Sequence, residues 1–118
     1  MRALRGATQL TADDPVEMTE VVVELVSAML ERNGLSTDDL ISVIFTSTPD
    51  LRSTFPAAAA RTLGIGDVPL LCAQELDVEG GLPRVVRVLA HVSMDVPRQD
   101  VAHVYLRGAE VLRQDLAQ

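Results

Sequence analysis

The stretch DPVEMTEVVVELVSAMLERNG, residues 14–34, decides how the rest of the chain is arranged. Asp14 is a favourable N-cap residue, Pro15 suits the first helical position, and Glu17 is spaced for a capping box. Asn33-Gly34 supplies a left-handed stop at the other end. The pattern predicts one long amphipathic helix that covers a sheet with its apolar stripe, which consists of Val21, Val22, Leu25, Val26, Met29 and Leu30.

Predicted strands flank this helix on both sides in the sequence. Alternation from residue 84 to residue 92 places Arg87 on the same face as Val85 and Leu89. The pattern is that of an α+β protein with a mixed, mostly five-stranded sheet packed against one long helix, in a single domain spanning residues 1–118. We expect strands near residues 2–8, 40–46, 68–72, 84–92 and 101–106, and a short helix from about residue 53 to Arg61.

The composition favours an oligomer and argues against nucleic acid. Hydrophobic residues make up 47% of the 118 residues but aromatic ones only 3%, so a small aliphatic domain has apolar surface to spare for a homo-oligomer. A formal net charge of −7 and so few aromatic side chains fit neither phosphate neutralisation nor base stacking.

The sequence gives no sign of a membrane or an export signal. No apolar run reaches the roughly 18 to 20 residues that a transmembrane helix needs, and residues 1–6 lack the apolar core of a signal peptide. The lone Cys72 cannot form a disulfide within the chain, which agrees with a reducing compartment. We therefore expect a cytoplasmic protein.

The basic residues are ten arginines and no lysine, and several of them interrupt apolar stretches. Arg5, Arg61 and Arg87 are of this kind. Because the guanidinium group is a planar fork that matches carboxylates, convergent arginines predict a pocket for a small acid with more than one carboxylate. Each arginine taken singly also fits a structural ion pair.

The remaining reactive residues give no metal or cofactor signature. His91 and His103 lie on separate predicted strands with no cysteine or carboxylate at ligand spacing, so we read both as ordinary sheet residues. No glycine-rich phosphate loop is present, and no residue is spaced to act as a base for Cys72. A reaction that needs neither a nucleophile nor a metal suits this inventory best.

Short segments along nearly the whole chain resemble the monofunctional α+β chorismate mutases of the Bacillus type. Each segment is weak alone, but their joint occurrence in this order is specific. The segments are residues 4–8, 48–51, 55–61, 72–75, 80–82, 84–88, 95–97, 103–106 and 111–113.

The resemblance implies an enzyme that isomerises chorismate to prephenate without a cofactor, in phenylalanine and tyrosine biosynthesis. It also implies a pseudo-barrel homotrimer with an active site at each subunit interface, where Phe55, Arg61 and Cys72 of one subunit face residues of the next. The implied catalytic residues are Arg87, Glu75 and Cys72, and the implied substrate-binding residues are Arg5, Tyr105, Phe55, Arg61, Leu112 and Arg113.

Two other functions fit the chain less well. One is a small trimeric enzyme of the enamine or imine deaminase kind, which also holds a carboxylate with an interfacial arginine. The other is a non-enzymatic regulatory module that binds a small acid at a subunit interface. The first does not explain Glu75, Arg87 and Tyr105 together, and the second fits poorly because no effector domain is attached.

Overall fold

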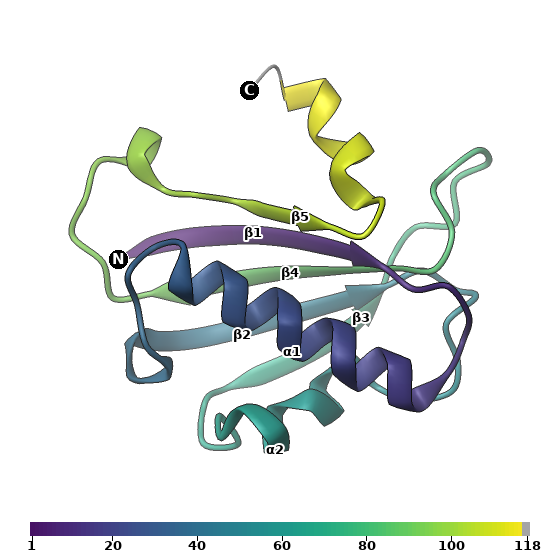
Figure 1. The fold of residues 1–118 in the computed structure, drawn as a ribbon, viewed down its shortest axis with the longest axis horizontal. Helices are drawn as coiled ribbons and strands as arrows, with labels where there is room; N and C mark the ends of the chain where they lie inside the picture. The colour runs from purple at the N-terminus through teal and green to yellow at the C-terminus, as the bar shows by residue number, and fades with distance from the viewer. Residues whose placement is uncertain (117–118) are drawn as a thin grey trace.

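The computed structural model describes residues 1–116, and the side chains of residues 1–112. Five strands and two α-helices alternate with short 3₁₀ segments (Figure 1). They are β1 (Arg2–Gln9), α1 (Pro15–Glu31), β2 (Leu40–Ser47), α2 (Ala60–Leu63), β3 (Leu70–Gln74), β4 (Val85–Val92) and β5 (Val104–Leu106). The 3₁₀ segments are Thr37–Asp39, Pro56–Ala59, Arg98–Asp100 and Ala109–Leu116.

The strands form one mixed sheet in the order β3-β2-β4-β1-β5. The central strand β4 is antiparallel to both β1 and β2, whereas β3 is parallel to β2 and β5 is parallel to β1. Helix α1 crosses one face of this sheet (Figure 1). The predicted α+β class, with a five-stranded sheet and one long helix, is confirmed.

Helix α1 begins as the sequence predicts, but its capping box is incomplete. The Asp14 carboxylate accepts a hydrogen bond of 2.8 Å from the Glu17 amide. The Glu17 carboxylate does not return to Asp14; it accepts instead from the amide and hydroxyl of Thr11 at 2.7 and 2.9 Å. The predicted left-handed stop is present, because Gly34 has a φ of 66°.

The core lies between α1 and the sheet. Gly6 is essential to this contact, because a Cβ at residue 6 would come within 2.5 Å of the Met29 sulfur. Glycine therefore allows β1 and α1 to approach closely. The buried side chains of the sheet include Leu4, Val43, Phe45, Val86 and Val88, and those of the helix are Met18, Val21, Val22, Leu25, Val26, Met29 and Leu30.

Within residues 1–116, no α-helix covers the other face of the sheet, which we call the open face. Its apolar residues are partly exposed, and Leu71 is 61% exposed. The segment Ala109–Leu116 covers one end only, where Ala109 packs with Ala7 and Val85. The open face consists of Ala3 and Arg5 of β1, Ile44 and Thr46 of β2, Leu71 and Ala73 of β3, Arg87 and Leu89 of β4, and Tyr105 of β5.

Strand β5 is shorter than predicted and starts at Val104. In the segment before it, the side chain of Asn33 bonds to the backbone of Ala102 at 2.8 and 2.9 Å. The Arg5 amide donates to Nδ1 of His103 at 2.9 Å. These side-chain bonds replace the backbone ladder that alternation alone predicts. The 3₁₀ segment at Ala109–Leu116 was not predicted at all.

The structure contains no candidate for a transmembrane helix. Within residues 1–116, no helix combines the length and the apolar character needed to cross a membrane.

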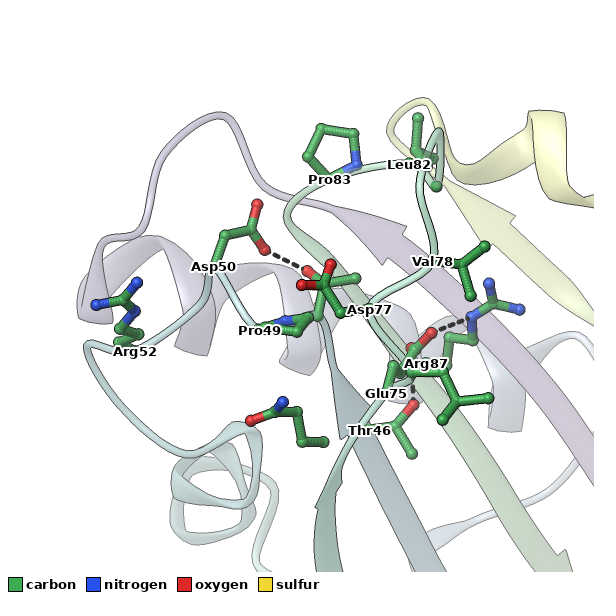
Figure 2. A pocket seen from close by; sticks show the side chains of 14 residues that line it. Thr46, Pro49, Asp50, Arg52, Glu75, Asp77, Val78, Leu82, Pro83 and Arg87 are labelled. Atoms are coloured by element: carbon green, nitrogen blue, oxygen red, sulfur yellow. Dashed lines mark hydrogen bonds and ion pairs between the residues drawn. The ribbon is translucent and has the colours of Figure 1, made fainter.

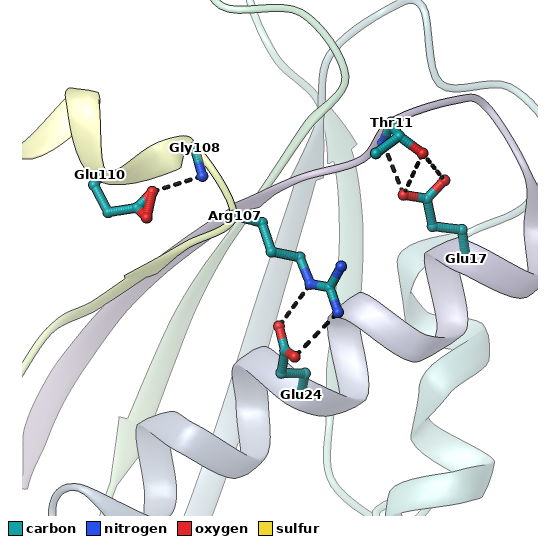
Figure 3. Close-up of polar contacts among 6 residues, drawn as sticks. All are labelled: Thr11, Glu17, Glu24, Arg107, Gly108 and Glu110. Carbon is teal, nitrogen blue, oxygen red and sulfur yellow. Dashed lines mark hydrogen bonds and ion pairs between the residues drawn. The ribbon is translucent and has the colours of Figure 1, made fainter.

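Exposed carboxylates hold α1 to the loops around it (Figure 3). Besides the bonds of Glu17, the Glu24 carboxylate accepts from Nε and a terminal nitrogen of Arg107 at 2.8 and 3.2 Å. The Thr11 amide lowers the pKa of Glu17 below its ordinary value of 4.5, and the Arg107 guanidinium does the same to the pKa of Glu24. Both carboxylates therefore stabilise the fold in their charged form.

We predict that the protein loses stability as the pH falls below about 4.5. Because the folded-state pKa values of Glu17 and Glu24 are depressed, their contribution is present above about pH 4.5 and disappears as the pH falls through the folded-state values. The double variant Glu17→Gln/Glu24→Gln should show a flatter dependence of the melting temperature on pH. The control is Glu31→Gln, an exposed change at the end of the same helix, which should leave the dependence of the melting temperature on pH as it is in the parent protein. The same dependence in the parent protein, the double variant and the control would contradict the stabilising role of Glu17 and Glu24.

Candidate active site

The register of the sheet gathers the predicted site residues on the open face. Arg87 of β4 lies opposite Thr46 of β2 on one side and Ala7 of β1 on the other, and Ala7 in turn lies opposite Tyr105 of β5. Arg5 lies two residues before Ala7 on β1. Since neighbouring strands are about 4.8 Å apart, Arg5 and Tyr105 both start within roughly 10 Å of Arg87.

Arg87 forms an ion pair with Glu75, and Glu75 is held from its other side by Thr46 (Figure 2). Nε of Arg87 lies 3.0 Å from Oε1 of Glu75, and the Thr46 hydroxyl donates to Oε2 at 2.8 Å. The Glu75 side chain is 16% exposed and that of Arg87 is 50% exposed. An ion pair with a half-exposed arginine adds little stability, so its main effect is to fix the direction of the guanidinium group.

Glu75 reaches Arg87 because it continues strand β3. Its amide donates to the Ser47 carbonyl at 3.0 Å, as in a parallel ladder. Residues 71, 73 and 75 therefore point to the same side of the sheet as Thr46 and Arg87. Sequence reasoning missed Thr46, although its place two residues after Ile44 on an alternating strand was a usable signal.

Two cavities meet at Arg87. One, of about 350 Å³, is lined by Arg5, Arg87, Tyr105 and Leu112 together with Thr46. The other, of about 780 Å³, includes Glu75 in its wall and shares Thr46 and Arg87 with the first. The structure thus brings together five of the residues that the resemblance implies, and they are Arg5, Glu75, Arg87, Tyr105 and Leu112.

Phe55 and Cys72 lie apart from this group. Alternation turns Cys72 to the side of the sheet that α1 covers, where it is partly buried against the core. Cys72 and Phe55 line another cavity of about 350 Å³, which shares no lining residue with the Arg5 cavity but shares Thr48, Arg52 and Gln74 with the cavity that includes Glu75. Phe55 is 73% exposed there, and Arg61 on the neighbouring helix α2 is exposed as well. The side chain of Arg113 lies outside the described residues.

Each of the two histidines of the chain makes a polar contact with a neighbouring strand. His91 lies on β4 with Nδ1 3.1 Å from the Ser42 hydroxyl, and His103 precedes β5 and accepts from the Arg5 amide. Among the described residues, no group of three or more histidine, cysteine, aspartate or glutamate side chains is placed to hold a metal ion.

Comparison with known proteins shows the family to which the chain belongs. A family model described as chorismate mutase type I matches residues 1–116. The chain belongs to the chorismate mutase type I family. A chorismate mutase of Thermus thermophilus is 50% identical over 117 residues, which cover 98% of this chain and 96% of that protein. A chorismate mutase of Bacillus subtilis is 40% identical over 118 residues, with 99% and 93% covered.

The solved structure of a chorismate mutase from Clostridium thermocellum has the same fold. It superposes with a TM-score of 0.91 at 44% sequence identity, covering 94% of this chain and 99% of that one. The resemblance to Bacillus-type chorismate mutases seen in the sequence is confirmed. As a chorismate mutase family member, the chain has the predicted α+β architecture over nearly its whole length.

Proposed function

We propose that Arg87, Glu75, Arg5 and Tyr105 form half of an active site that two copies of this chain complete together. The chain is an isomerase that converts chorismate to prephenate, the reaction of the family to which it belongs, in aromatic amino acid biosynthesis. The observation that carries the site is the ordered Arg87–Glu75 ion pair at the junction of two cavities.

The reaction needs no covalent intermediate between the substrate and the enzyme. Chorismate rearranges by a concerted [3,3] shift in which an ether C–O bond breaks while a C–C bond forms, so no proton has to be transferred. The enzyme has to hold the compact chair-like conformer and to stabilise the charge that separates in the transition state. Fixed charges serve this purpose best, because they need no reorganisation during the reaction.

Arg87 supplies the donor to the ether oxygen, where negative charge grows. Figure 2 shows its two terminal nitrogens pointing away from Glu75, while Nε is occupied by the ion pair of 3.0 Å. The terminal nitrogens can therefore meet the ether oxygen while Glu75 keeps the guanidinium in place. This contact is stronger in the transition state than in the ground state, so it lowers the barrier.

Thr46 is a positioning residue for this pair. Its hydroxyl donates to one oxygen of Glu75 while Arg87 meets the other, so the carboxylate is held between them. A carboxylate has lone pairs left after two such contacts and can still accept from the ring hydroxyl of the substrate. That hydroxyl lies on the side of the ring where positive charge develops.

The smaller cavity holds the acidic part of the substrate. Arg5 and Tyr105 bind a substrate carboxylate there, since an arginine fork and a phenol are both suited to an anion. Leu112 lies in the same wall and excludes water.

The second half of the site comes from a neighbouring copy. Phe55, Cys72 and the exposed Arg61 lie away from Arg87 in one chain, so a single substrate meets both groups only between two copies. Cys72 then offers a weak polar contact and Phe55 an apolar wall. The exposed apolar side chains of the open face, such as Leu71, support a buried interface, and we assign a homotrimer to the single domain of residues 1–118.

Two further properties complete the proposal. We place the protein in the cytoplasm, where the free Cys72 thiol stays reduced. Family membership favours this isomerase over the deaminase-like enzyme and the regulatory module that the sequence left open.

Replacing Arg87 should remove most of the activity. We expect Arg87→Ala to lower kcat by about 10²–10³-fold, because one fixed donor to developing charge is worth ~2.7–4 kcal/mol. Arg87→Lys should remain poor, since an ammonium group lacks the fork geometry. The assay follows the loss of chorismate absorbance, and circular dichroism checks folding. Near-normal turnover by a folded Arg87→Ala protein would refute the role.

The Thr46 hydroxyl should matter for turnover more than for folding. We expect Thr46→Val to lower kcat by about tenfold or more, because a hydrogen bond to a charged group is worth roughly 1.5–3 kcal/mol. Thr46→Ser keeps the hydroxyl and should stay within about threefold of the parent protein. Steady-state kinetics and melting temperatures distinguish a positioning role from a packing role. If both variants lose kcat equally, or if Thr46→Val lowers only the melting temperature, then Thr46 acts only in packing.

A shared site predicts complementation between inactive variants. Arg61→Ala and Arg87→Ala damage different halves, so mixed trimers formed by joint refolding should contain roughly a quarter of intact sites and regain activity. Arg5→Ala mixed with Arg87→Ala is the matched control, because both changes fall in one cavity of one chain and no intact site can form. Recovery in the control, or none in the first mixture, would contradict the shared site.

A further inference from the structure

Residues 48–51 are one of the segments that carry the family resemblance, but none of them is among the implied site residues. They follow directly after β2. Thr48, Pro49 and Asp50 line the cavity of about 780 Å³ that also includes Glu75 and Arg87 (Figure 2). Their contacts give them a task in the fold, because they bind both ends of one loop.

This loop connects β3 to β4 and comprises residues 75–84. Glu75 is its first residue, and Arg87 follows shortly after its end, so the ion pair of the site closes the base of the loop. The tip is exposed to solvent, with Leu76 and Val78 exposed by 88% and 65%. The position of the loop therefore depends mainly on how its two ends are held.

Both ends are bound by residues 47–50. At the first end, the Ser47 carbonyl accepts from the Glu75 amide at 3.0 Å. At the second end, the Thr48 amide donates to the Val85 carbonyl at 3.0 Å, and the Thr48 hydroxyl accepts from the Val85 amide at 3.1 Å. One short segment thus sets the separation of the two ends.

Asp50 fixes the last residue of the loop. Its carboxylate accepts from the Arg84 amide, which lies 3.0 Å from Oδ2 and 3.3 Å from Oδ1, and also from the Thr48 hydroxyl. Arg84 has a φ of 53°, a left-handed conformation that is unfavourable for a residue with a Cβ. Such a conformation persists only where its surroundings enforce it. The Leu10 carbonyl contributes as well, since it accepts from Nε of Arg84 at 3.0 Å.

The bonds of Asp50 determine where β4 begins. Arg87 lies three residues after Arg84, on the face of β4 that meets Glu75. If the end of the loop relaxes, Arg87 and Glu75 lose their fixed separation, and a displacement of about 1 Å at a catalytic group can cost roughly 10²-fold in rate. All these bonds run within one chain, so they do not depend on how a second copy covers the open face.

We propose that Asp50 is a positioning residue for the Glu75–Arg87 pair. Its carboxylate holds the Arg84 amide, so that the loop closes with Nε of Arg87 3.0 Å from the Glu75 carboxylate. The effect on turnover rests on the proposed function, whereas the hold of Asp50 on Arg84 does not.

The first experiment compares Asp50→Ala with Asp50→Asn. Both changes remove the charge, but Asn keeps both bonds, because its carbonyl accepts from the Arg84 amide and its Nδ2 donates to the Thr48 hydroxyl. We expect Asp50→Ala to lower kcat about tenfold and Asp50→Asn to stay within about threefold of the parent protein. Asp67→Ala, in an exposed turn between α2 and β3, is the matched control and should leave kcat unchanged. Parental kcat in Asp50→Ala, or an equal loss in Asp50→Asn, would overturn the proposal.

A double-mutant cycle shows whether Asp50 acts through the ion pair. Arg87→Ala already breaks the pair, so adding Asp50→Ala should cost less than about twofold in kcat. Equal losses in the two backgrounds would show that Asp50 acts elsewhere, and the proposal would be wrong. If Asp50→Ala does not fold, Thr48→Val takes its place, because it removes the hydroxyl that Asp50 and the Val85 amide share. An unchanged kcat in Thr48→Val would then overturn the proposal.

Hydrogen exchange separates this proposal from the proposed function. In Asp50→Ala, the Arg84 amide should exchange about tenfold faster than in the parent protein, while the amide of the buried Leu25 in α1 keeps its rate. Unchanged exchange at Arg84 would refute the role of Asp50, whatever the protein does with chorismate. Faster exchange in a protein that does not turn over chorismate would support the hold on Arg84 and refute the proposed function instead.

Discussion

One helix can cover only one face of a five-stranded sheet, and this limit shapes the whole molecule. The stripe of α1 buries the side of the sheet that carries Leu4, Phe45 and Val88. The strands still alternate, so every second residue points the other way. The face left over holds both apolar residues and arginines, and Arg5, Arg87 and Tyr105 of the proposed site line one cavity there.

The fold was largely predictable because its signals are local. Helix caps, the 3.6-residue period of residues 14–34 and the alternation around Arg87 are all contained in short windows of sequence. The site was less predictable because it depends on register between distant strands. Thr46 meets Glu75 across 29 positions of sequence, and no local pattern states that pairing. Strand β5 was misjudged for a related reason, since the side chain of Asn33 lies far from Ala102 in the chain.

The electrostatic potential at the site depends more on nearby charges than on the net charge of the chain. A chain with a net charge of −7 repels a dianion at long range, but salt screens charges beyond about 8–10 Å. Within a cavity, a pair of charges about 4 Å apart is worth roughly 4 kcal/mol at an effective dielectric constant near 20. Arg5 and Arg87, which line one cavity, therefore act on a bound anion more strongly than distant acidic residues do, while Glu75 offsets part of the charge of Arg87.

Assembly and catalysis depend on each other in the proposed trimer. In one copy the Arg87 side chain is 50% exposed, so water competes for its donors and screens its charge. A neighbouring copy that covers the open face removes this water and also buries apolar side chains such as Leu71. The apolar area stabilises the interface, and the lower dielectric strengthens the contact between Arg87 and the developing negative charge. A protein of this size can thus obtain from association the desolvated site that its single helix cannot provide.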